Sequence, residues 1–310
     1  MTELITEPSR RRRRGPGVGR PIWMGRPPAV VLALKALALI VIVALIAFPF
    51  LIVVSTSLAT EAEINAGGGY VLLPTTPTLD AYLQVLAGDV VTRAIVVSLG
   101  VTVVGTAVSL VSTVLAAYAL SRRGTLLHRP LLTLVLLTFL FTPGLIPIYL
   151  MIKQLGLLDS YWALILPGAV SAFNLVIVRG FFMGIPGELL DSARIDGASE
   201  FRILAQIVVP LSRAVIAVIG MFYAVGYWNA FFSALLYLND STKWPLQLVL
   251  RTYVLQGTPI GKEAAEVGVL PPTQALQMAV VVLAIIPIAC IYPFLQRHFR
   301  RGVLTGAVKG

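Results

Sequence analysis

Long apolar runs, separated by charged or turn-forming segments, dominate this sequence of 310 residues. An α-helix needs about 20 apolar residues to cross the hydrocarbon layer of a membrane. Inside that layer every backbone N–H and C=O group needs a partner within the protein, which a helix supplies. The sequence therefore predicts an all-α membrane protein with six transmembrane helices, at Ala29–Val54, Ala94–Leu120, Leu131–Ile152, Tyr161–Met183, Leu211–Leu238 and Thr273–Leu295.

Positive charges gather on alternate sides of these runs. The chain has a net charge of +10, which could indicate a nucleic-acid partner. However, 18 of the 24 Lys and Arg residues lie in the N-terminal tail, in or beside the second and fourth connecting segments, or after the last run. This alternation follows the positive-inside rule. It predicts a multi-pass protein with both termini in the cytoplasm and no nucleic-acid partner.

The runs divide the chain into four parts. They are a basic cytoplasmic tail, a first transmembrane helix with an outer loop, a five-helix core and a second cytoplasmic tail, at 1–28, 29–93, 94–296 and 297–310. In the outer loop, Gly and Pro predict turns and one short amphipathic helix after Thr78. The second outer segment, Asn239–Pro272, is too long for a simple connection, and either a docking loop or a solvated loop would fit.

Two spans carry features that affect packing. Small residues recur at every fourth position of the second run, which lets a neighbouring helix approach and favours packing over a polar pore lining; they are Gly105, Ser109, Thr113 and Ala117. The third run contains TPGLIP, in which Pro143 and Pro147 each remove a backbone hydrogen bond. A broken or bent helix is expected there, either to let a cavity open and close or as a static kink.

Polar groups inside the spans are candidates for contact with a solute, because they are costly in a membrane. The fifth run holds YAVGYWNAFF, in which Tyr223, Tyr227 and Phe231 fall on one helical face. Aromatic faces beside an amide would suit a sugar ring, whereas packing between helices with an interhelical hydrogen bond is the other interpretation. The candidates for a substrate pathway are Tyr223, Tyr227, Trp228, Asn229 and, as a weaker case, Asn174.

Several sources of chemistry are missing from the chain. The six runs contain no Asp or Glu, although a carrier driven by protons or sodium normally keeps an ionisable relay there. There is no GxxxxGK[ST] phosphate loop, and one cysteine and two histidines offer no metal site. We therefore expect a non-catalytic protein without a bound cofactor, energised by another polypeptide. An ion-coupled secondary carrier and a passive membrane scaffold are the alternatives.

The segment between the fourth and fifth runs predicts a compact helical hairpin. IPGELLDSARI is typical of a short helix, with Pro186 near its start and acidic residues near the positive end of its dipole. Gly197 suits the left-handed turn that ends such a helix. Ser199 can cap a second helix, FRILAQIVV, before Pro210 starts the next span. Such a protrusion is stiff enough to transmit force from an external motor.

This segment resembles the EAA loop in permease subunits of binding-protein-dependent ABC importers. The family pattern is E-A-A, three residues, Gly, nine residues and I-x-L-P. The same spacing holds here at Asp191, Ser192, Ala193, Gly197, Ile207 and Pro210. Asp191 stands in place of Glu, Ser192 in place of Ala and Val209 in place of Leu, and Glu188 could share the contact expected of Asp191.

Four longer segments extend the resemblance from Ala29 to Gly310. They are similar to carbohydrate-importer permeases of the maltose-permease type, and most of all to those associated with oligosaccharides from complex polysaccharides. The segments are GLLDSYWALILPGAVSAFNL, FFMGIPGELLDSARIDGAS, YWNAFFSALLYLNDSTKWPLQ and QRHFRRGVLTGAVKG.

The resemblance implies the fold of an ABC type I importer permease in a bacterial plasma membrane. It implies three kinds of protein partner: a second related permease, two ATP-binding subunits that hold ATP and magnesium, and an extracytoplasmic sugar-binding protein reached by Asn239–Pro272. It also places the C-terminal tail, Gly302–Gly310, between the ATP-binding subunits. Within the cytoplasmic loop 184–210, it assigns the coupling role to Glu188, Asp191, Ser192, Ala193, Asp196, Gly197, Ile207 and Pro210.

Overall fold

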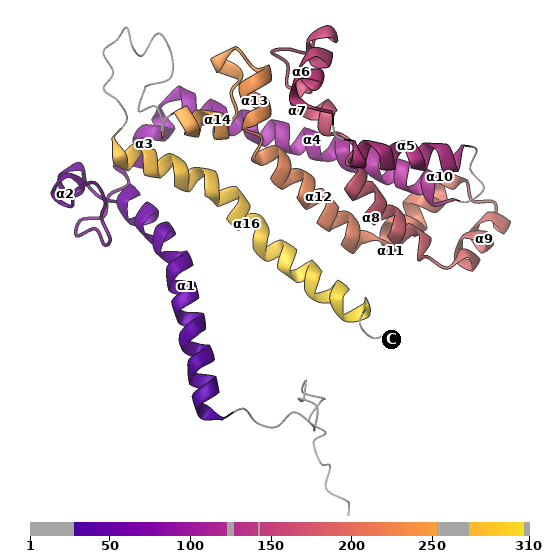
Figure 1. The fold of residues 1–310 in the computed structure, drawn as a ribbon, viewed down its shortest axis with the longest axis horizontal. Helices are drawn as coiled ribbons and strands as arrows, with labels where there is room; N and C mark the ends of the chain where they lie inside the picture. Colours follow the sequence, from indigo (N-terminus) through magenta and orange to yellow (C-terminus); the bar gives the residue numbers. More distant parts are fainter. Residues whose placement is uncertain (1–27, 123–126, 142, 253, 255–272, 307–310) are drawn as a thin grey trace, which may run out of the picture. The chain divides into compact units, whose positions relative to one another are not determined.

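The computed structural model describes residues 28–122, 127–141, 143–252, 254 and 273–306, and within these ranges it contains helices and turns but no strand (Figure 1). The chain divides into two compact units, Met1–Phe50 and Leu51–Gly310. In the described ranges, three helices are long and apolar enough to cross a membrane, or up to six if each bent pair of helices forms one span. The predicted all-α, multi-span architecture is therefore confirmed.

The unit boundary falls inside helix α1 (Ala29–Ser57). The side chains of α1 are exposed from Ala29 to Leu51, and apart from Lys35 they are apolar on every side of the helix. A helix of this kind suits contact with lipid or another membrane chain. Its last three residues, Ser55, Thr56 and Ser57, belong to the second unit and are buried.

The outer loop contains two short helices, α2 (Glu61–Ala66) and α3 (Asp80–Ala87). The helix after Thr78 was predicted, whereas α2 was missed. Its signal is a capping box, in which Thr60 accepts the Glu63 N–H and the Glu63 carboxylate accepts the Thr60 N–H. Glu63 also accepts hydrogen bonds from the side chain and backbone of Thr75. The hydrogen bond from the Thr75 side chain contributes most to lowering the pKa of the Glu63 carboxyl.

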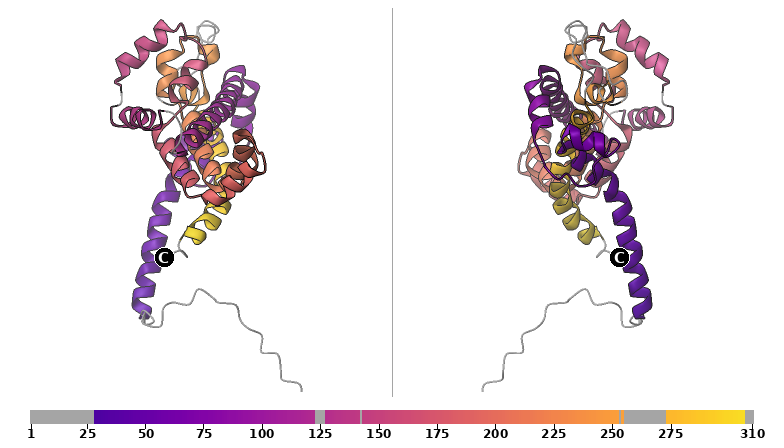
Figure 2. Two further views of the ribbon diagram at one scale, coloured as in Figure 1. Left: turned by 90° about the vertical axis from the view of Figure 1, so that its right-hand side faces the viewer. Right: turned by 90° about the vertical axis from the view of Figure 1, so that its left-hand side faces the viewer.

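The small residues of α4 (Asp89–Ser121) face α12 (Arg213–Trp228), and the two helices pack along much of their length (Figure 1). Gly105, Ser109, Thr113 and Ala117 are all buried. The packing interpretation of this stripe is therefore confirmed. Beside these helices lies α8 (Ala172–Met183), which also contacts α4 and α12 (Figure 2).

The third and fourth spans are interrupted. α5 (His128–Leu140) and α6 (Leu145–Gln154) replace a continuous third helix, as expected from the prolines of TPGLIP. The fourth span is α7 (Trp162–Ile165), the short helix η1 (Leu166–Gly168) and α8, with a bend of 50°. That bend was not predicted, and it coincides with Pro167 inside η1.

The prediction of one helix over Leu211–Leu238 was wrong. α12 begins at Arg213 after a bend of 86° and ends at Trp228, and α13 (Phe232–Tyr237) follows a break. At the break, the amide of Asn229 donates to the Val225 carbonyl at 3.0 Å, so a side chain competes with the helix for its own backbone acceptor. The prediction that Pro210 starts the next span was also wrong, because Pro210 lies inside the short helix α11 (Val209–Leu211).

The second outer segment does not consist of a solvated loop alone. After the short helix η3 (Ser241–Lys243), α14 (Leu246–Arg251) places Leu246, Leu248 and Val249 among buried residues. α14 contacts α4 and α16 (Gln274–Gly306). The rest of the segment, including most of the predicted docking loop, lies outside the described residues. The last helix continues beyond its predicted end at Leu295.

Candidate functional site

The predicted hairpin between the fourth and fifth spans is present. α9 (Gly187–Ile195) has Asp196 as its C-cap residue, and Gly197 follows with φ +79°. Its N–H donates to the Arg194 carbonyl at 3.0 Å, and the Ala198 N–H donates to the Ala193 carbonyl at 2.9 Å. These two bonds form a Schellman motif, which satisfies helix carbonyls that would otherwise lack partners. The glycine therefore sets a defined turn between two helices.

The second arm of the hairpin starts as predicted and then changes its winding. The Ser199 hydroxyl accepts the Arg202 N–H at 3.4 Å and caps α10 (Glu200–Ile203). A π-helical turn, η2 (Leu204–Val208), follows and leads into α11. Pro210 lacks an N–H, and π-turns and prolines are both frequent at sharp bends in helices. The turn and the proline precede the 86° bend into α12.

The two arms of the hairpin enclose an open groove of about 440 Å³. Five of the predicted coupling residues meet in its lining, together with Leu189, Gln206 and Leu211; they are Ser192, Ala193, Asp196, Ile207 and Pro210. Glu188 and Asp191 do not line this groove, and both are exposed on α9. The hairpin also exposes large apolar side chains, of which Ile195 at 87% and Phe201 at 74% are the most exposed. Exposed apolar groups beside a groove are typical of a contact surface.

Charged groups hold the hairpin together and attach it to α4. Arg194 binds Asp191 at 2.8 Å and Glu200 at 2.9 Å. Glu200 in turn accepts a hydrogen bond from the Tyr118 hydroxyl near the end of α4. The bonds from Tyr118 and then Arg194 lower the pKa of the Glu200 carboxyl, which stays ionised at neutral pH. Both ion pairs are exposed, so each contributes at most about 1 kcal/mol, and their effect is mainly to orient the hairpin.

Further contacts secure the same end of α4. The Arg122 guanidinium lies 4.5 Å from the centre of the Tyr118 ring. From α8, Arg179 donates to the Leu120 carbonyl at 2.8 Å, a favourable site for a cation at a helix C-terminus. The Arg194–Asp191 pair has a signal in the sequence, because the two residues are three apart on a helix. The Tyr118–Glu200 contact joins residues 82 apart and has no local signal.

The aromatic residues proposed for a substrate pathway are bonded within the chain. The Tyr223 hydroxyl lies 2.7 Å from Thr113 Oγ1, and the Tyr227 hydroxyl lies 2.7 Å from Ser109 Oγ. Trp228 Nε1 donates to the Ala284 carbonyl at 3.0 Å. All three aromatic side chains are buried. These bonds are those expected from the helix-packing interpretation, and contact of these residues with a solute stays a prediction.

Asparagine residues occupy different environments at the two remaining candidate positions. Asn229 caps the end of α12 and is exposed. Asn174 is buried in the first turn of α8, where its N–H donates to Ser171 Oγ at 3.4 Å. Phe231, expected on the face of Tyr223 and Tyr227, lies beyond the helix end. Asn229 is therefore the candidate whose side chain is open to contact from outside the subunit.

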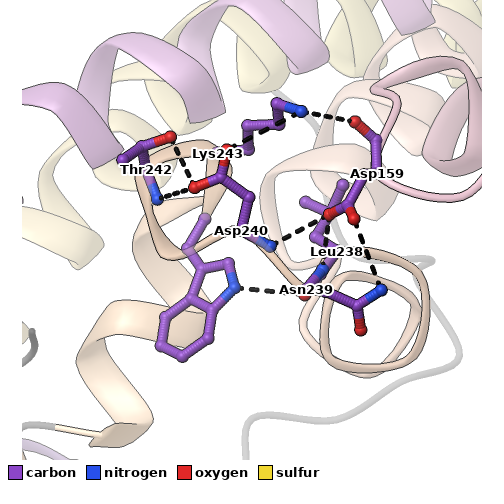
Figure 3. Close-up of polar contacts among 7 residues, drawn as sticks. Asp159, Leu238, Asn239, Asp240, Thr242 and Lys243 are labelled. Carbon is purple, nitrogen blue, oxygen red and sulfur yellow. Dashed lines mark hydrogen bonds and ion pairs between the residues drawn. The ribbon is translucent and has the colours of Figure 1, made fainter. Parts of the chain in front are cut away.

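A clasp of polar residues ties the start of the second outer segment to the loop after α6 (Figure 3). The Asp159 carboxylate accepts the N–H groups of Asn239 at 2.6 Å and Asp240 at 2.9 Å. Lys243 Nζ donates to the Asp159 carbonyl at 3.0 Å. The Asp240 N–H contributes most to lowering the pKa of the Asp159 carboxyl. In the described residues, no group of three or more His, Cys, Asp or Glu residues could hold a metal.

Comparison with known protein families identifies the family to which these packed helices and the hairpin belong. Residues 109–305 match the family model described as "Binding-protein-dependent transport system inner membrane component". This match covers more than half of the chain. The chain belongs to this family.

Individual relatives agree with this assignment. Polygalacturonan/rhamnogalacturonan transport system permease protein YtcP of Bacillus subtilis (strain 168) is 48% identical over 264 residues, which are 84% of this chain and 92% of that protein. Protein LplC of the same strain is 49% identical over 264 residues, 84% of this chain and 89% of that protein. A chain of a bacterial ABC transporter involved in the import of the acidic polysaccharide alginate is similar with a TM-score of 0.81 at 28% identity, over 89% of this chain and 99% of that chain.

The chain is thus an inner-membrane permease subunit of an ABC importer for sugars or oligosaccharides, and it is not itself an enzyme. The predicted family, the all-α permease fold and the membrane location are confirmed, whereas the cytoplasmic position of both termini stays a prediction. The predicted second permease, ATP-binding subunits and binding protein are the partners typical of this family. The comparisons do not favour the ion-coupled carrier or the passive scaffold.

Proposed function

We propose that ATP-binding subunits drive this permease through the hairpin Pro186–Leu211. The observation that carries the proposal is the bonded path from the hairpin to a membrane-spanning helix, through Arg194, Glu200 and Tyr118. A hairpin held in this way moves as a body and displaces α4 with it. The groove, with exposed Ile195 and Phe201 nearby, supports contact with another protein on this surface.

In the same proposal the chain forms half of a translocation pathway with a second, related permease. Both termini and the hairpin lie in the cytoplasm, as the distribution of Lys and Arg indicates. An extracytoplasmic binding protein delivers the sugar on the opposite side. ATP and magnesium are held by the ATP-binding subunits, and this chain binds no cofactor.

The proposed cargo is an oligosaccharide derived from an acidic polysaccharide. Two similar proteins support this choice, one named for polygalacturonan and rhamnogalacturonan and the other part of an importer of alginate. Polygalacturonan and alginate are polymers of uronic acids, which carry one carboxylate on each sugar ring. The cargo therefore has a regular array of negative charges that the pathway must accommodate.

Replacing Gly197 tests the coupling role. Gly197→Val forces a β-branched residue into a left-handed turn, a conformation that costs L-residues about 1–2 kcal/mol or more. We expect the reconstituted importer to lose uptake while the variant still inserts into the membrane. The measurements are uptake and ATP hydrolysis stimulated by the sugar-loaded binding protein, in proteoliposomes.

The matched control is Gly187→Val in the same hairpin. An added Cβ meets nothing within 4 Å at either glycine, but only Gly197 has a positive φ. The control should therefore retain uptake and stimulated hydrolysis close to those of the wild type. Normal coupling in Gly197→Val, or equal defects in both variants, would refute the role of the glycine turn.

A further inference from the structure

Arg251 ends a helix that packs against the spans and does not stand in an outer solvent loop. The side chains of Leu246, Leu248 and Val249 in α14 are buried, and the Leu246 N–H donates to Ser98 Oγ of α4 at 2.7 Å. From the end of this helix, the exposed Arg251 places its guanidinium 4.7 Å from the centre of the Phe231 ring. The cation thus lies beside the chain break that follows α12.

This break lies in or near the membrane interior. α4 has 33 residues, about 50 Å at 1.5 Å per residue, so its centre always falls inside a hydrocarbon layer of about 30 Å. The central residue is Gly105, against which the Tyr227 ring packs. Phe231 is four residues further along, which is at most about 14 Å even for extended chain. The Phe231 ring, with the Arg251 guanidinium over it, therefore lies inside that layer or close to its surface.

A cation at this depth needs a special environment. Ionisable side chains within membrane proteins usually face a water-filled cavity or a partner of opposite charge. Among the described residues, none of the ion pairs involves Arg251. Its planar guanidinium matches a carboxylate with two parallel hydrogen bonds. The exposed Asn229 lies two residues from Phe231 and adds an amide to the same region.

We propose that Arg251 binds a uronate carboxylate of the oligosaccharide as it passes through the permease, with the Phe231 ring supporting the guanidinium. The inference rests on the proposed function, since it assumes that the cargo is acidic. It assigns selectivity for charge to Arg251, whereas coupling to ATP is assigned to the hairpin. A variant of either site should therefore leave the other property intact.

The test uses the complete importer in lipid nanodiscs, without its binding protein. The two probes are trigalacturonate and its fully methyl-esterified form, which has the same sugar rings but no carboxylates. In the wild type, trigalacturonate should bind at least tenfold more tightly than the ester. Arg251→Gln should weaken trigalacturonate binding about tenfold or more, the loss expected for a charged hydrogen bond, and should leave binding of the ester unchanged. Arg251→Lys, which keeps the charge but loses the fork, should be intermediate.

Arg93→Gln is the matched control, because Arg93 is also on the outer half of the subunit but pairs with Asp89 at 3.3 Å. It should bind both probes as the wild type does. Unchanged trigalacturonate binding in Arg251→Gln, an equal loss in Arg93→Gln, or no preference for the acid in the wild type would each overturn the proposal. Loss of the second permease from the Arg251→Gln complex would overturn it as well, because Arg251 would then be an interface cation. Each of these results leaves the outcome for Gly197→Val unaffected.

Discussion

Gly105 provides a quantitative test of the packing between α4 and α12. A Cβ added at this position would lie 2.9 Å from both Cδ2 and Cε2 of Tyr227 and 3.0 Å from its Cγ. Carbon atoms in contact normally lie about 3.5–4.0 Å apart. The Gly105→Ala variant therefore requires the Tyr227 ring to move away by several tenths of an ångström or more.

The Tyr227 ring has little freedom to move. Its hydroxyl is bonded to Ser109 Oγ at 2.7 Å and donates to the Ile165 carbonyl at 3.1 Å, and only 8% of the residue is exposed. Overpacking of this kind costs roughly 1–3 kcal/mol, and a buried hydroxyl that loses its partners costs about 1–3 kcal/mol more. We expect Gly105→Ala to be destabilised by these amounts relative to a glycine-to-alanine change without a clash.

Gly100→Ala is that comparison. Gly100 lies in the same helix, and an added Cβ there meets nothing within 4 Å. Both variants gain the helix propensity of alanine, about 1 kcal/mol, so the difference between them isolates the clash. At about 2–4 °C per kcal/mol, Gly105→Ala should unfold at least roughly 2 °C below Gly100→Ala when the complex is heated in nanodiscs.

A double-mutant cycle identifies the cause. If the Tyr227 ring is the obstacle, Gly105→Ala should cost little in a Tyr227→Ala background, because the two residues are in contact and their effects are not additive. Equal stability of the two alanine variants would refute the reasoning. So would a penalty for Gly105→Ala that stays the same when the Tyr227 ring is removed.

Two further predictions concern the ends of the core. Tyr118→Phe removes the bond to Glu200 and should lower uptake per ATP hydrolysed several-fold with little change in thermal stability. The control Tyr70→Phe, at an exposed tyrosine, should change neither quantity. Normal coupling in Tyr118→Phe would contradict the proposed link between the hairpin and α4. Asp159→Asn should lower the thermal midpoint at neutral pH. Because the pKa of the Asp159 carboxyl is lowered, the difference in thermal midpoint between the wild type and Asp159→Asn should persist down to about pH 4, the pKa of a free Asp, and shrink below it. A difference that vanishes by pH 6 would contradict the role of the clasp. So would an equal loss of stability in the control Asp89→Asn.

Much of the hairpin was predictable because its signals are local. Gly197 supplies a positive φ and Ser199 a cap, and both depend on residues within a few positions of each other. The small-residue stripe of α4 was predictable for a similar reason, since one residue per helical turn defines a face. What the stripe packs against depends on residues more than 100 positions away, such as the Thr113–Tyr223 contact, and no local pattern encodes it.

The errors arose where apolar composition conceals a helix end. YAVGYWNAFF has the hydropathy of a continuous span, yet α12 stops at Trp228. Average hydropathy predicts which segments are apolar enough to lie in lipid. It does not detect a helix end at which a side-chain amide, such as that of Asn229, donates a hydrogen bond to a carbonyl of the same helix. α14 was missed because it is short and its signal is not local. Its six residues are too few to span a membrane, and its burial depends on contact with Ser98.

One helix connects the two proposed sites. α4 contacts the hairpin through Tyr118, and in its other half Ser98 Oγ accepts the first N–H of α14, the helix that carries Arg251. Between these points, the hydroxyls of Ser109 and Thr113 are bonded to Tyr227 and Tyr223 of α12. An α-helix held at several points along its length transmits a displacement with little bending. Movement of the hairpin should therefore change the position of α14, and with it the strength with which Arg251 holds a carboxylate. In Tyr118→Phe, affinity for trigalacturonate should then lose its dependence on bound nucleotide while its value without nucleotide stays the same.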